Sequence, residues 1–154
     1  MTIRGPLDHI DLSIRDPERS IPFYETFFTS LGYERLRIEH PGFDGERPER
    51  ASWATQLPGG AWFGIEVRPA SGEHRGQLHD RHAPGLHHMA FHADSRVCVD
   101  QVFQAMHEMG ATVLDAPADY SGRAGYSEGY YAVFFADPDG MKLEVVYAPR
   151  TNPA

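Results

Sequence analysis

Residues 86–93, LHHMAFHA, repeat the pattern of residues 7–14, LDHIDLSI. In the first stretch Ile10, Leu12 and Ile14 share one face of a strand, because successive side chains of a strand point to opposite sides. The residues between them are polar, and the second stretch alternates in the same way. Each stretch therefore predicts a strand with one apolar and one polar face, and the repetition predicts two similar modules.

The same series of elements follows each of these strands. In the first half Asp16 and Pro17 introduce a helix that Gly32 ends. Three strands come next, over residues 33–39, 50–57 and 61–67, with a polar loop over 40–49. The first half is predicted to be a βαβββ module.

In the second half Asp94 or Ser95 can cap a helix that Gly110 ends. Strands are predicted over residues 111–114, 130–135 and 141–147, with a long loop over 115–129. The fold class is α+β, with two tandem βαβββ modules that form a curled mixed sheet around a central cavity. The modules are expected at residues 1–67 and 86–148, joined by a linker over 68–85 and followed by a tail over 149–154.

Three landmarks recur in the two halves with offsets that agree within one residue. They are His9 and His88, Gly32 and Gly110, and Glu66 and Glu144. The alternation of each strand places the two histidines and the two glutamates on the face turned away from the helices. If the modules curl these faces around one cavity, all four side chains point into it.

Two imidazoles and two carboxylates suit a divalent metal ion such as Zn, Ni, Co, Mn or Fe. The two carboxylates balance the charge of the ion, and a six-coordinate metal keeps two positions open. A substrate with neighbouring oxygens could chelate there, and Glu66 or Glu144 could act as the general base. The sequence thus predicts a metal site made of His9, Glu66, His88 and Glu144.

Other side chains are candidates for the substrate pocket. They are Trp62, His92, Asp11, Tyr130 and Phe134. Tyr130 and Phe134 share one face of their strand, but the sequence leaves open which face that is.

The composition of the 154 residues limits the partners and the location of the protein. A formal net charge of -8 argues against a nucleic-acid partner, which needs clustered Lys and Arg. The chain has no apolar run of signal-peptide or membrane-spanning length, so we expect no membrane partner and a cytoplasmic location. The one cysteine, Cys98, excludes an internal disulfide and lacks the His and acid context of a nucleophile.

Three stretches carry a resemblance to a known family. They are LDHIDLSIRDPERSIPFYETFFTSLGYE, GLHHMAFHADS and GYYAVFFADPDGMKLEVV, of which the last, with DPDG before Glu144, is the most specific. The chain resembles the vicinal oxygen chelate superfamily, which includes glyoxalase I, the bleomycin resistance proteins and dioxygenases, from Pro6 to Tyr147. The resemblance implies paired βαβββ modules, metal ligands at the four predicted positions, and a homodimer.

A carboxylate at each expected place is similar to glyoxalase I, which isomerises a glutathione hemithioacetal. The resemblance therefore implies a metal-dependent lyase or isomerase acting on a small molecule, and methylmalonyl-CoA epimerases are close relatives. The alternatives are a metal-free, drug-binding protein of the bleomycin resistance type and an extradiol-type dioxygenase, against which Glu66 speaks because those dioxygenases use three protein ligands. No stretch matches a glutathione site, so the substrate stays open.

Overall fold

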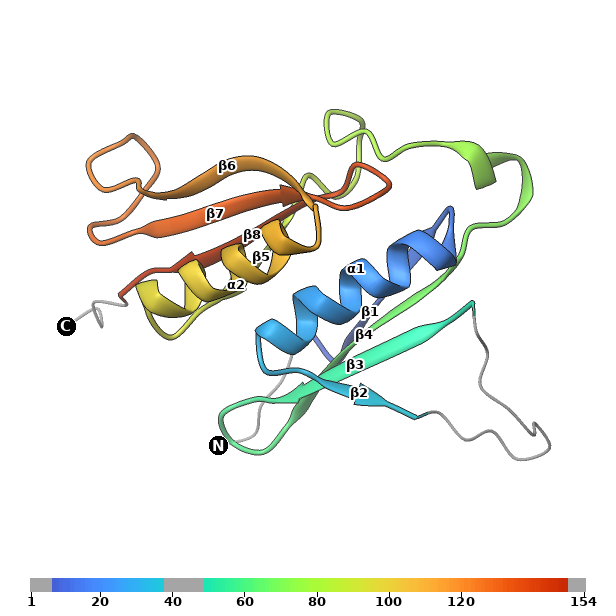
Figure 1. Ribbon diagram of the computed structural model, residues 1–154, viewed down its shortest axis with the longest axis horizontal. Coiled ribbons are helices and arrows are strands. Elements are labelled where there is room, and N and C mark those ends of the chain that lie inside the picture. The colour runs from blue at the N-terminus through green and yellow to red at the C-terminus, as the bar shows by residue number, and fades with distance from the viewer. Residues whose placement is uncertain (1–6, 38–48, 150–154) are drawn as a thin grey trace. The chain divides into compact units, whose positions relative to one another are not determined.

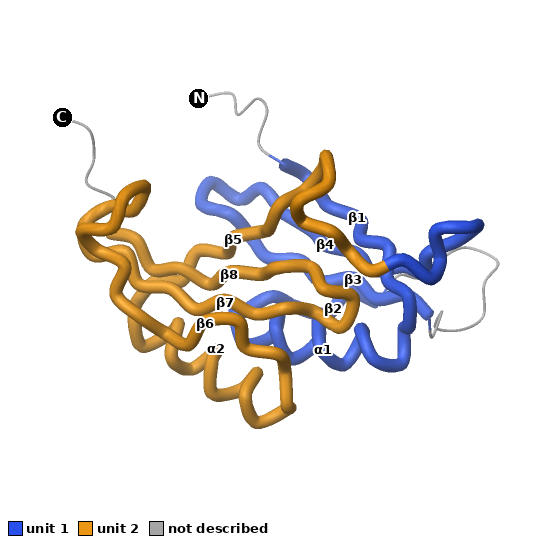
Figure 2. Tube along the Cα trace, turned by 90° about the horizontal axis from the view of Figure 1, so that it is seen from above, with its two compact units in different colours: residues 1–77 blue, residues 78–154 orange. Residues whose placement is uncertain are grey.

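A computed structural model of the chain describes residues 7–37 and 49–149. The chain divides into two compact units, Met1–Gln77 and Leu78–Ala154, which Figure 2 shows in two colours and which are described one by one below. Several predicted features lie outside the described residues. These are the end of the strand predicted over 33–39, most of the loop over 40–49, and the tail beyond residue 149.

The first unit is a four-stranded mixed sheet with one long helix. Its elements are β1 (His9–Ile14), α1 (Pro17–Ser30), β2 (Glu34–Leu36), β3 (Ala51–Gln56) and β4 (Trp62–Pro69). The strand order is β1-β4-β3-β2, in which β1 runs parallel to β4 and the other pairs are antiparallel (Figure 1). The unit is therefore the predicted βαβββ module.

Capping and packing explain why α1 forms where it does. Asp16 accepts a hydrogen bond from the backbone N–H of Glu18 at 3.0 Å, and Pro17 occupies the first turn. Gly32 follows the helix with a φ of +80°, a conformation that glycine adopts without strain. On the sheet Trp53 is fully buried, and its indole N–H donates to the Glu25 carboxylate of α1 at 3.0 Å. This contact shows which face of β3 the helix covers.

The second unit repeats this arrangement. Its elements are β5 (Met89–His92), α2 (Arg96–Glu108), β6 (Thr112–Asp119), β7 (Tyr131–Ala136) and β8 (Lys142–Tyr147). The strand order is β5-β8-β7-β6, again with one parallel pair, β5 and β8. Ser95 is the N-cap of α2 and accepts from the N–H of Cys98 at 3.1 Å. The predicted α+β class and the two βαβββ modules are confirmed, as two open four-stranded sheets.

The register of the parallel pairs matches the repeat found in the sequence. Asp11 on β1 stands opposite Glu66 on β4, and Ala90 on β5 stands opposite Glu144 on β8. His9 and His88 thus each come two residues before the residue that stands opposite the glutamate of the same unit. The two glutamates occupy equivalent places in the two sheets.

The structure corrects the predicted boundaries of β6 and β5. β6 continues to Asp119, whereas a loop was predicted from residue 115, because Ala118 and Asp119 still pair with β7 after two register shifts. β6 is the edge strand, where Pro117 is tolerated since its missing N–H removes no ladder bond. The strand predicted from Leu86 begins only at Met89.

The segment predicted as a linker over residues 68–85 also contains regular structure. β4 extends through Arg68 and Pro69 because both pair with β1, and a short 3-10 helix covers Gly72–Gly76. Further on, the backbone N–H of His79 donates to the carbonyl of Asp139 at 2.8 Å and ties this segment to the second unit.

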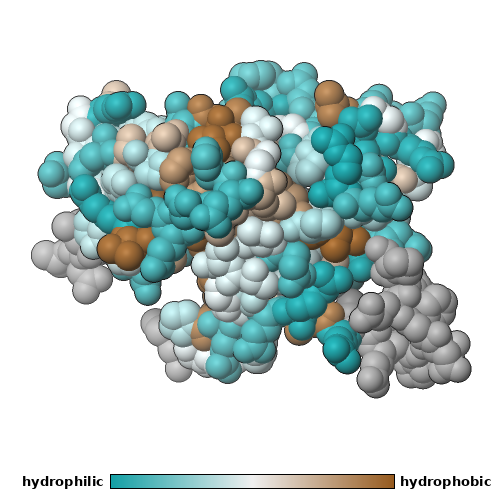
Figure 3. All heavy atoms as spheres, in the orientation of Figure 1, coloured by the Kyte–Doolittle hydropathy of each residue, from teal (hydrophilic) through white to brown (hydrophobic). Residues whose placement is uncertain are grey.

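The drawn surface is largely hydrophilic, and apolar residues form scattered spots on it (Figure 3). Large apolar side chains that are exposed include Leu7, Leu78 and Val97. None of the helices in residues 7–37 and 49–149 is long and apolar enough to span a membrane.

The N-cap of α1 gives a first prediction. Replacing Asp16 by Ala is expected to lower the free energy of unfolding by about 1 kcal/mol, because the first turn loses its side-chain acceptor. Asp16→Asn keeps an acceptor oxygen and serves as the matched control, with little change. Urea unfolding followed by circular dichroism measures both, and equal losses in the two variants would contradict the assignment.

An ion pair between α2 and the end of β6 gives a second prediction. Asp119 accepts from the N–H of Ser121 at 2.9 Å and from Arg96 at 2.6 Å, and these hydrogen bonds, that of Ser121 first, lower its pKa to about 2. A lowered carboxyl pKa stabilises the fold above the ordinary value near 3.8, and this contribution is lost as the pH falls through about 2.

Asp119→Asn should therefore be less stable than the wild type at neutral pH. The difference should shrink as the pH falls from about 4 toward about 2. Urea unfolding at a series of pH values measures it, with Asp115→Asn on the same strand as the control. A difference that stays constant over this range would refute the role given to Asp119.

Candidate functional site

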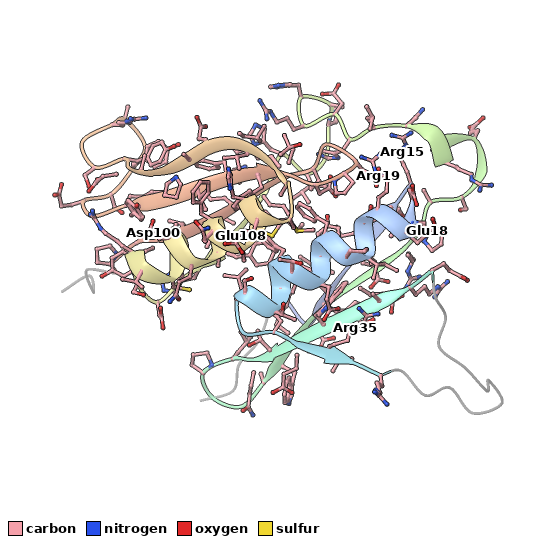
Figure 4. All side chains as sticks on the ribbon, viewed as in Figure 1. Arg15, Glu18, Arg19, Arg35, Asp100 and Glu108 are labelled. Atoms are coloured by element: carbon pink, nitrogen blue, oxygen red, sulfur yellow. The ribbon has the colours of Figure 1, made fainter. Side chains whose placement is uncertain are left out.

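Contacts with α2 decide which face of β7 carries the predicted pocket residues. The Tyr131 hydroxyl donates to the Asp100 carboxylate at 2.8 Å, and Asp100 projects from α2 (Figure 4). By strand alternation Tyr131, Val133 and Phe135 therefore face the helix. Phe134 faces away from the helix, directly opposite Glu144 in the ladder between β7 and β8. This register shows that Phe134 lies on the face turned away from α2, which the sequence had left open.

The face of the second sheet that points away from α2 carries a compact polar cluster. The His88 Nε2 lies 3.2 Å from the Glu144 Oε2, and the Tyr130 hydroxyl donates to the other carboxylate oxygen of Glu144. The Glu144 side chain is only 4% exposed, whereas that of His88 is 35% exposed. A buried carboxylate is unfavourable unless it is hydrogen-bonded, so both partners stabilise Glu144 in this position. His88 and Glu144 are called the second-unit pair below.

Tyr130 keeps its proton under ordinary conditions. Burial raises the pKa of its phenol well above the usual range, and the hydrogen bond to Glu144 raises that pKa further. The phenol thus acts as a permanent donor to Glu144. Tyr130 was predicted as a pocket residue, and its contact with Glu144 is a new finding of the structure.

His87 belongs to the same cluster, which the sequence did not predict. The Nδ1 atoms of His87 and His88 lie 2.7 Å apart, so the two rings are joined by a hydrogen bond. Burial, followed by the charges of His88 and Lys142, lowers the pKa of His87. Strand alternation gives no position for His87, because β5 begins only at Met89.

Four aromatic side chains, called the aromatic wall below, lie on the same face of the second sheet: Tyr120, Tyr126, Tyr130 and Phe134. Phe134, Tyr120, Ala132 and Val146 form a buried cluster, against which Tyr130 packs. Phe134 meets Tyr120 edge to face at 5.7 Å between ring centroids. Such contacts are favourable for aromatic rings, which present an electron-rich face to a neighbouring edge.

The aromatic wall contains residues that the sequence did not point to. Tyr120 and Tyr126 fall in the segment predicted as a loop over 115–129. Tyr126 lies 5.1 Å from Tyr120 and 4.9 Å from Tyr130, centroid to centroid. The repeated tyrosines between glycines were the available signal, but only the continuation of β6 places them over β7.

Two cations border the wall. The Lys142 Nζ lies 4.1 Å from the ring centroid of Phe134, and the guanidinium carbon of Arg123 lies 4.5 Å from that of Tyr120. His92, predicted for the pocket, is exposed and pairs with Val146. This face thus combines acidic, aromatic and positively charged groups.

In the first unit Glu66 is surrounded by cations. The Arg68 Nη2 donates to the Glu66 Oε1 at 2.7 Å and also contacts the Asp11 carboxylate at 2.6 Å. The Arg50 Nη1 lies farther away, at 3.6 Å from the same Glu66 oxygen, and the Ser52 hydroxyl donates to Glu66 Oε2 at 3.1 Å. The negative charge of Glu66 is therefore compensated by arginine.

His9 is much more open to solvent. Its side chain is 66% exposed, and its Nδ1 lies 2.8 Å from the Asp8 carboxylate. This hydrogen bond is the main reason why the pKa of His9 is raised, and the charges of Asp11 and Glu66 add to it. Trp62, another predicted pocket residue, is 52% exposed and begins β4. His9 and Glu66 are called the first-unit pair below.

Each unit brings its own predicted histidine and glutamate to the same face of its sheet. In residues 7–37 and 49–149 no group of three or more His, Cys, Asp or Glu side chains is arranged to hold a metal ion. The four-ligand site and the shared cavity stay predictions.

The comparisons with known proteins place this architecture in a family. A family model described as the Glyoxalase/Bleomycin resistance protein/Dioxygenase superfamily matches residues 6–145. The chain belongs to this superfamily. Membership accounts for the two βαβββ modules and confirms the resemblance of the sequence.

Individual relatives and solved structures match along nearly their whole length. The Bacillus subtilis protein YqjT, which is described as uncharacterized, is 31% identical over 142 residues, 91% of this chain and 97% of YqjT. The crystal structure of a candidate glyoxalase from Bacillus halodurans has a TM-score of 0.70 at 27% identity and covers 94% of this chain and 97% of its own. A glyoxalase/dioxygenase from Nostoc punctiforme has a TM-score of 0.62 at 21% identity, with 97% and 99% covered, and supports the fold.

The hydrogen bond from Tyr130 to Glu144 gives a third prediction. Tyr130→Phe should lower the free energy of unfolding by roughly 1–3 kcal/mol, because a buried carboxylate oxygen loses its donor. Tyr126→Phe, in the neighbouring ring, is the matched control and should change stability little. Urea unfolding measures both variants, and indistinguishable stabilities of Tyr130→Phe and the wild type would refute the assigned hydrogen bond.

Proposed function

We propose that this chain is a metal-dependent enzyme of the glyoxalase type, a lyase or isomerase. Its substrate would be a small molecule that chelates the metal through neighbouring oxygens. The observation that supports the proposal is the second-unit pair, in which an imidazole nitrogen and a buried carboxylate oxygen lie 3.2 Å apart. Two such donors on one face of a sheet are the ligand types that Zn, Ni, Co, Mn and Fe accept.

The surroundings of the second-unit pair fit a metal ion. Tyr130 donates to Oε1 of Glu144, which leaves Oε2 on the side of His88. The hydrogen bond fixes the orientation of the carboxylate, as partners of metal ligands commonly do. The Nδ1 of His88 is engaged with His87, and this contact holds the His88 ring with Nε2 toward the carboxylate.

The first-unit pair fits in its donor types but differs in its surroundings. The exposed ring of His9 is open to a ligand, whereas Glu66 must exchange its contact with Arg68 for the metal. We propose that both complete the ligand set, either in one chain or between two chains of a homodimer. We also propose a cytoplasmic protein without nucleic-acid or membrane partners. The net charge of -8 supports the absence of a nucleic-acid partner.

A bound divalent ion would supply a Lewis acid that stabilises negative charge developing on substrate oxygens. The chain's own residues would do the remaining work. Glu66 and Glu144 are the candidates for the general base, since a carboxylate near the substrate can accept a proton. Phe134 and its aromatic neighbours would exclude water from one side of the substrate, with Trp62, Asp11 and His92 as further contacts.

Metal analysis of the purified protein tests the proposal and gives a fourth prediction. Elemental analysis should find one of Zn, Ni, Co, Mn or Fe bound, and a chelator should remove it together with the activity. His88→Ala should weaken metal binding at least tenfold, because an imidazole ligand is lost. His107→Ala, on α2, is the matched control and should bind metal like the wild type. Absence of bound metal, together with indifference to His88→Ala, would sink the proposal.

The aromatic wall favours one second candidate, a metal-free protein that binds an aromatic ligand. Phe134, Tyr120 and Tyr126 offer ring faces and edges on which a planar ligand could stack. Tight binding of an aromatic compound that survives chelation, without any turnover, would favour this function over the enzyme.

A further inference from the structure

The two glutamates occupy equivalent positions in the two sheets but have different neighbours. On one side Glu66 stands opposite Ser52, and Glu144 stands opposite Phe134. Two residues after Glu66 the strand carries Arg68, whereas two residues after Glu144 it carries Val146. The repeat thus provides an internal comparison, because one fold surrounds a carboxylate in two ways.

Both carboxylates accept a hydrogen bond from a hydroxyl, which comes from β3 in the first unit and from the residue just before β7 in the second. Ser52 donates to Glu66 and Tyr130 donates to Glu144. The two glutamates therefore differ in their second partner. Glu66 is bound by a guanidinium at 2.7 Å, and the second contact of Glu144 is the imidazole of His88.

Arg68 is itself held in place from two sides. Its Nη2 contacts Glu66 and also the Asp11 carboxylate on the neighbouring strand β1, at 2.6 Å. The Glu66 side chain is 18% exposed, so its ion pair with Arg68 is screened less than a fully solvated one. The negative charge of Glu66 is already compensated by Arg68. A metal ion that approaches Glu66 is also repelled by the permanent positive charge of the Arg68 guanidinium.

We propose that Arg68 is a positioning residue that holds Glu66 away from a metal ion and so weakens metal binding by this chain. The inference rests on the proposed function. It makes the two glutamates inequivalent: Glu144 is available to a metal as it stands, whereas Glu66 joins only when it leaves Arg68. Val146 at the equivalent position of the second unit places no charge beside Glu144.

The test is a fifth prediction and measures metal affinity rather than activity. Arg68→Val, which copies the residue of the second unit, should bind Zn²⁺ and Ni²⁺ roughly fivefold or more tightly, as competition with a chromophoric chelator measures. Arg68→Lys keeps the charge and should stay close to the wild type. Arg35→Val removes the same charge from an arginine that pairs with Glu25 at 2.5 Å on the helix side, and should change nothing. Figure 4 labels Arg35 on β2.

Two further backgrounds identify the residue through which Arg68 acts. In Glu66→Gln the gain from Arg68→Val should disappear, whereas in Asp11→Asn it should persist, because only the first substitution removes the carboxylate in question. Loss of structure alone would not produce tighter binding that depends on Glu66. If Arg68→Val does not fold, Arg68→Gln removes the charge with a side chain closer in length, and the same result is expected.

The outcomes separate this inference from the proposed function. Wild-type protein that binds metal with the same affinity as Arg68→Val overturns the inference and leaves the proposed function standing. A gain that persists in Glu66→Gln also overturns it. If neither protein binds metal, both proposals are wrong. Binding that appears or tightens only in Arg68→Val, and only with Glu66 present, supports the inference.

Discussion

The alternation of side chains along β4 and β8 is the constraint on which the rest of this structure depends. Each of these strands is paired on both sides, and a helix covers one face of each sheet. Val67 and Val145 are fully buried on the helix faces of the two strands. Because the period of a strand is two, the neighbouring Glu66 and Glu144 must point to the opposite face. Burial of the apolar core thereby fixes where the acidic groups lie.

A carboxylate in that position needs compensation, and the two units supply it differently. Glu144 is almost completely buried and is stabilised by Tyr130 and His88. Glu66 is more exposed and is stabilised by Arg68. Both arrangements satisfy the requirement that buried charge be hydrogen-bonded or paired. They differ in what the carboxylate can still do, since a neighbouring imidazole can share a metal with it whereas a guanidinium competes with the metal.

The second unit adds an aromatic wall that distinguishes its face from that of the first. Because β6 continues to Asp119, Tyr120 packs against Phe134, the residue opposite Glu144. In the first unit the residue opposite the glutamate is Ser52. A fold shared across a superfamily leaves such surroundings free to vary, and the chemistry depends on them. Under the proposed function, Tyr120, Tyr126 and the cations beside them would select the substrate more than the shared modules would.

The sequence by itself determined the two βαβββ modules, the N-cap of α1 and the face on which His9, Glu66 and Glu144 lie, and it limited the N-cap of α2 to Asp94 or Ser95. These features follow from local signals, namely a period of two, a capping side chain and a glycine with positive φ. Tertiary structure alone decided the extent of β6, the orientation of Tyr130 and Phe134, the contact of His87 with His88 and the pairing of Glu66 with Arg68. Each of these depends on which strand or side chain lies opposite, and strand pairing joins residues far apart in the chain or shifts register at a bulge. A local pattern has no information about such partners, because the free energy that selects them comes from burial and hydrogen bonding across the sheet.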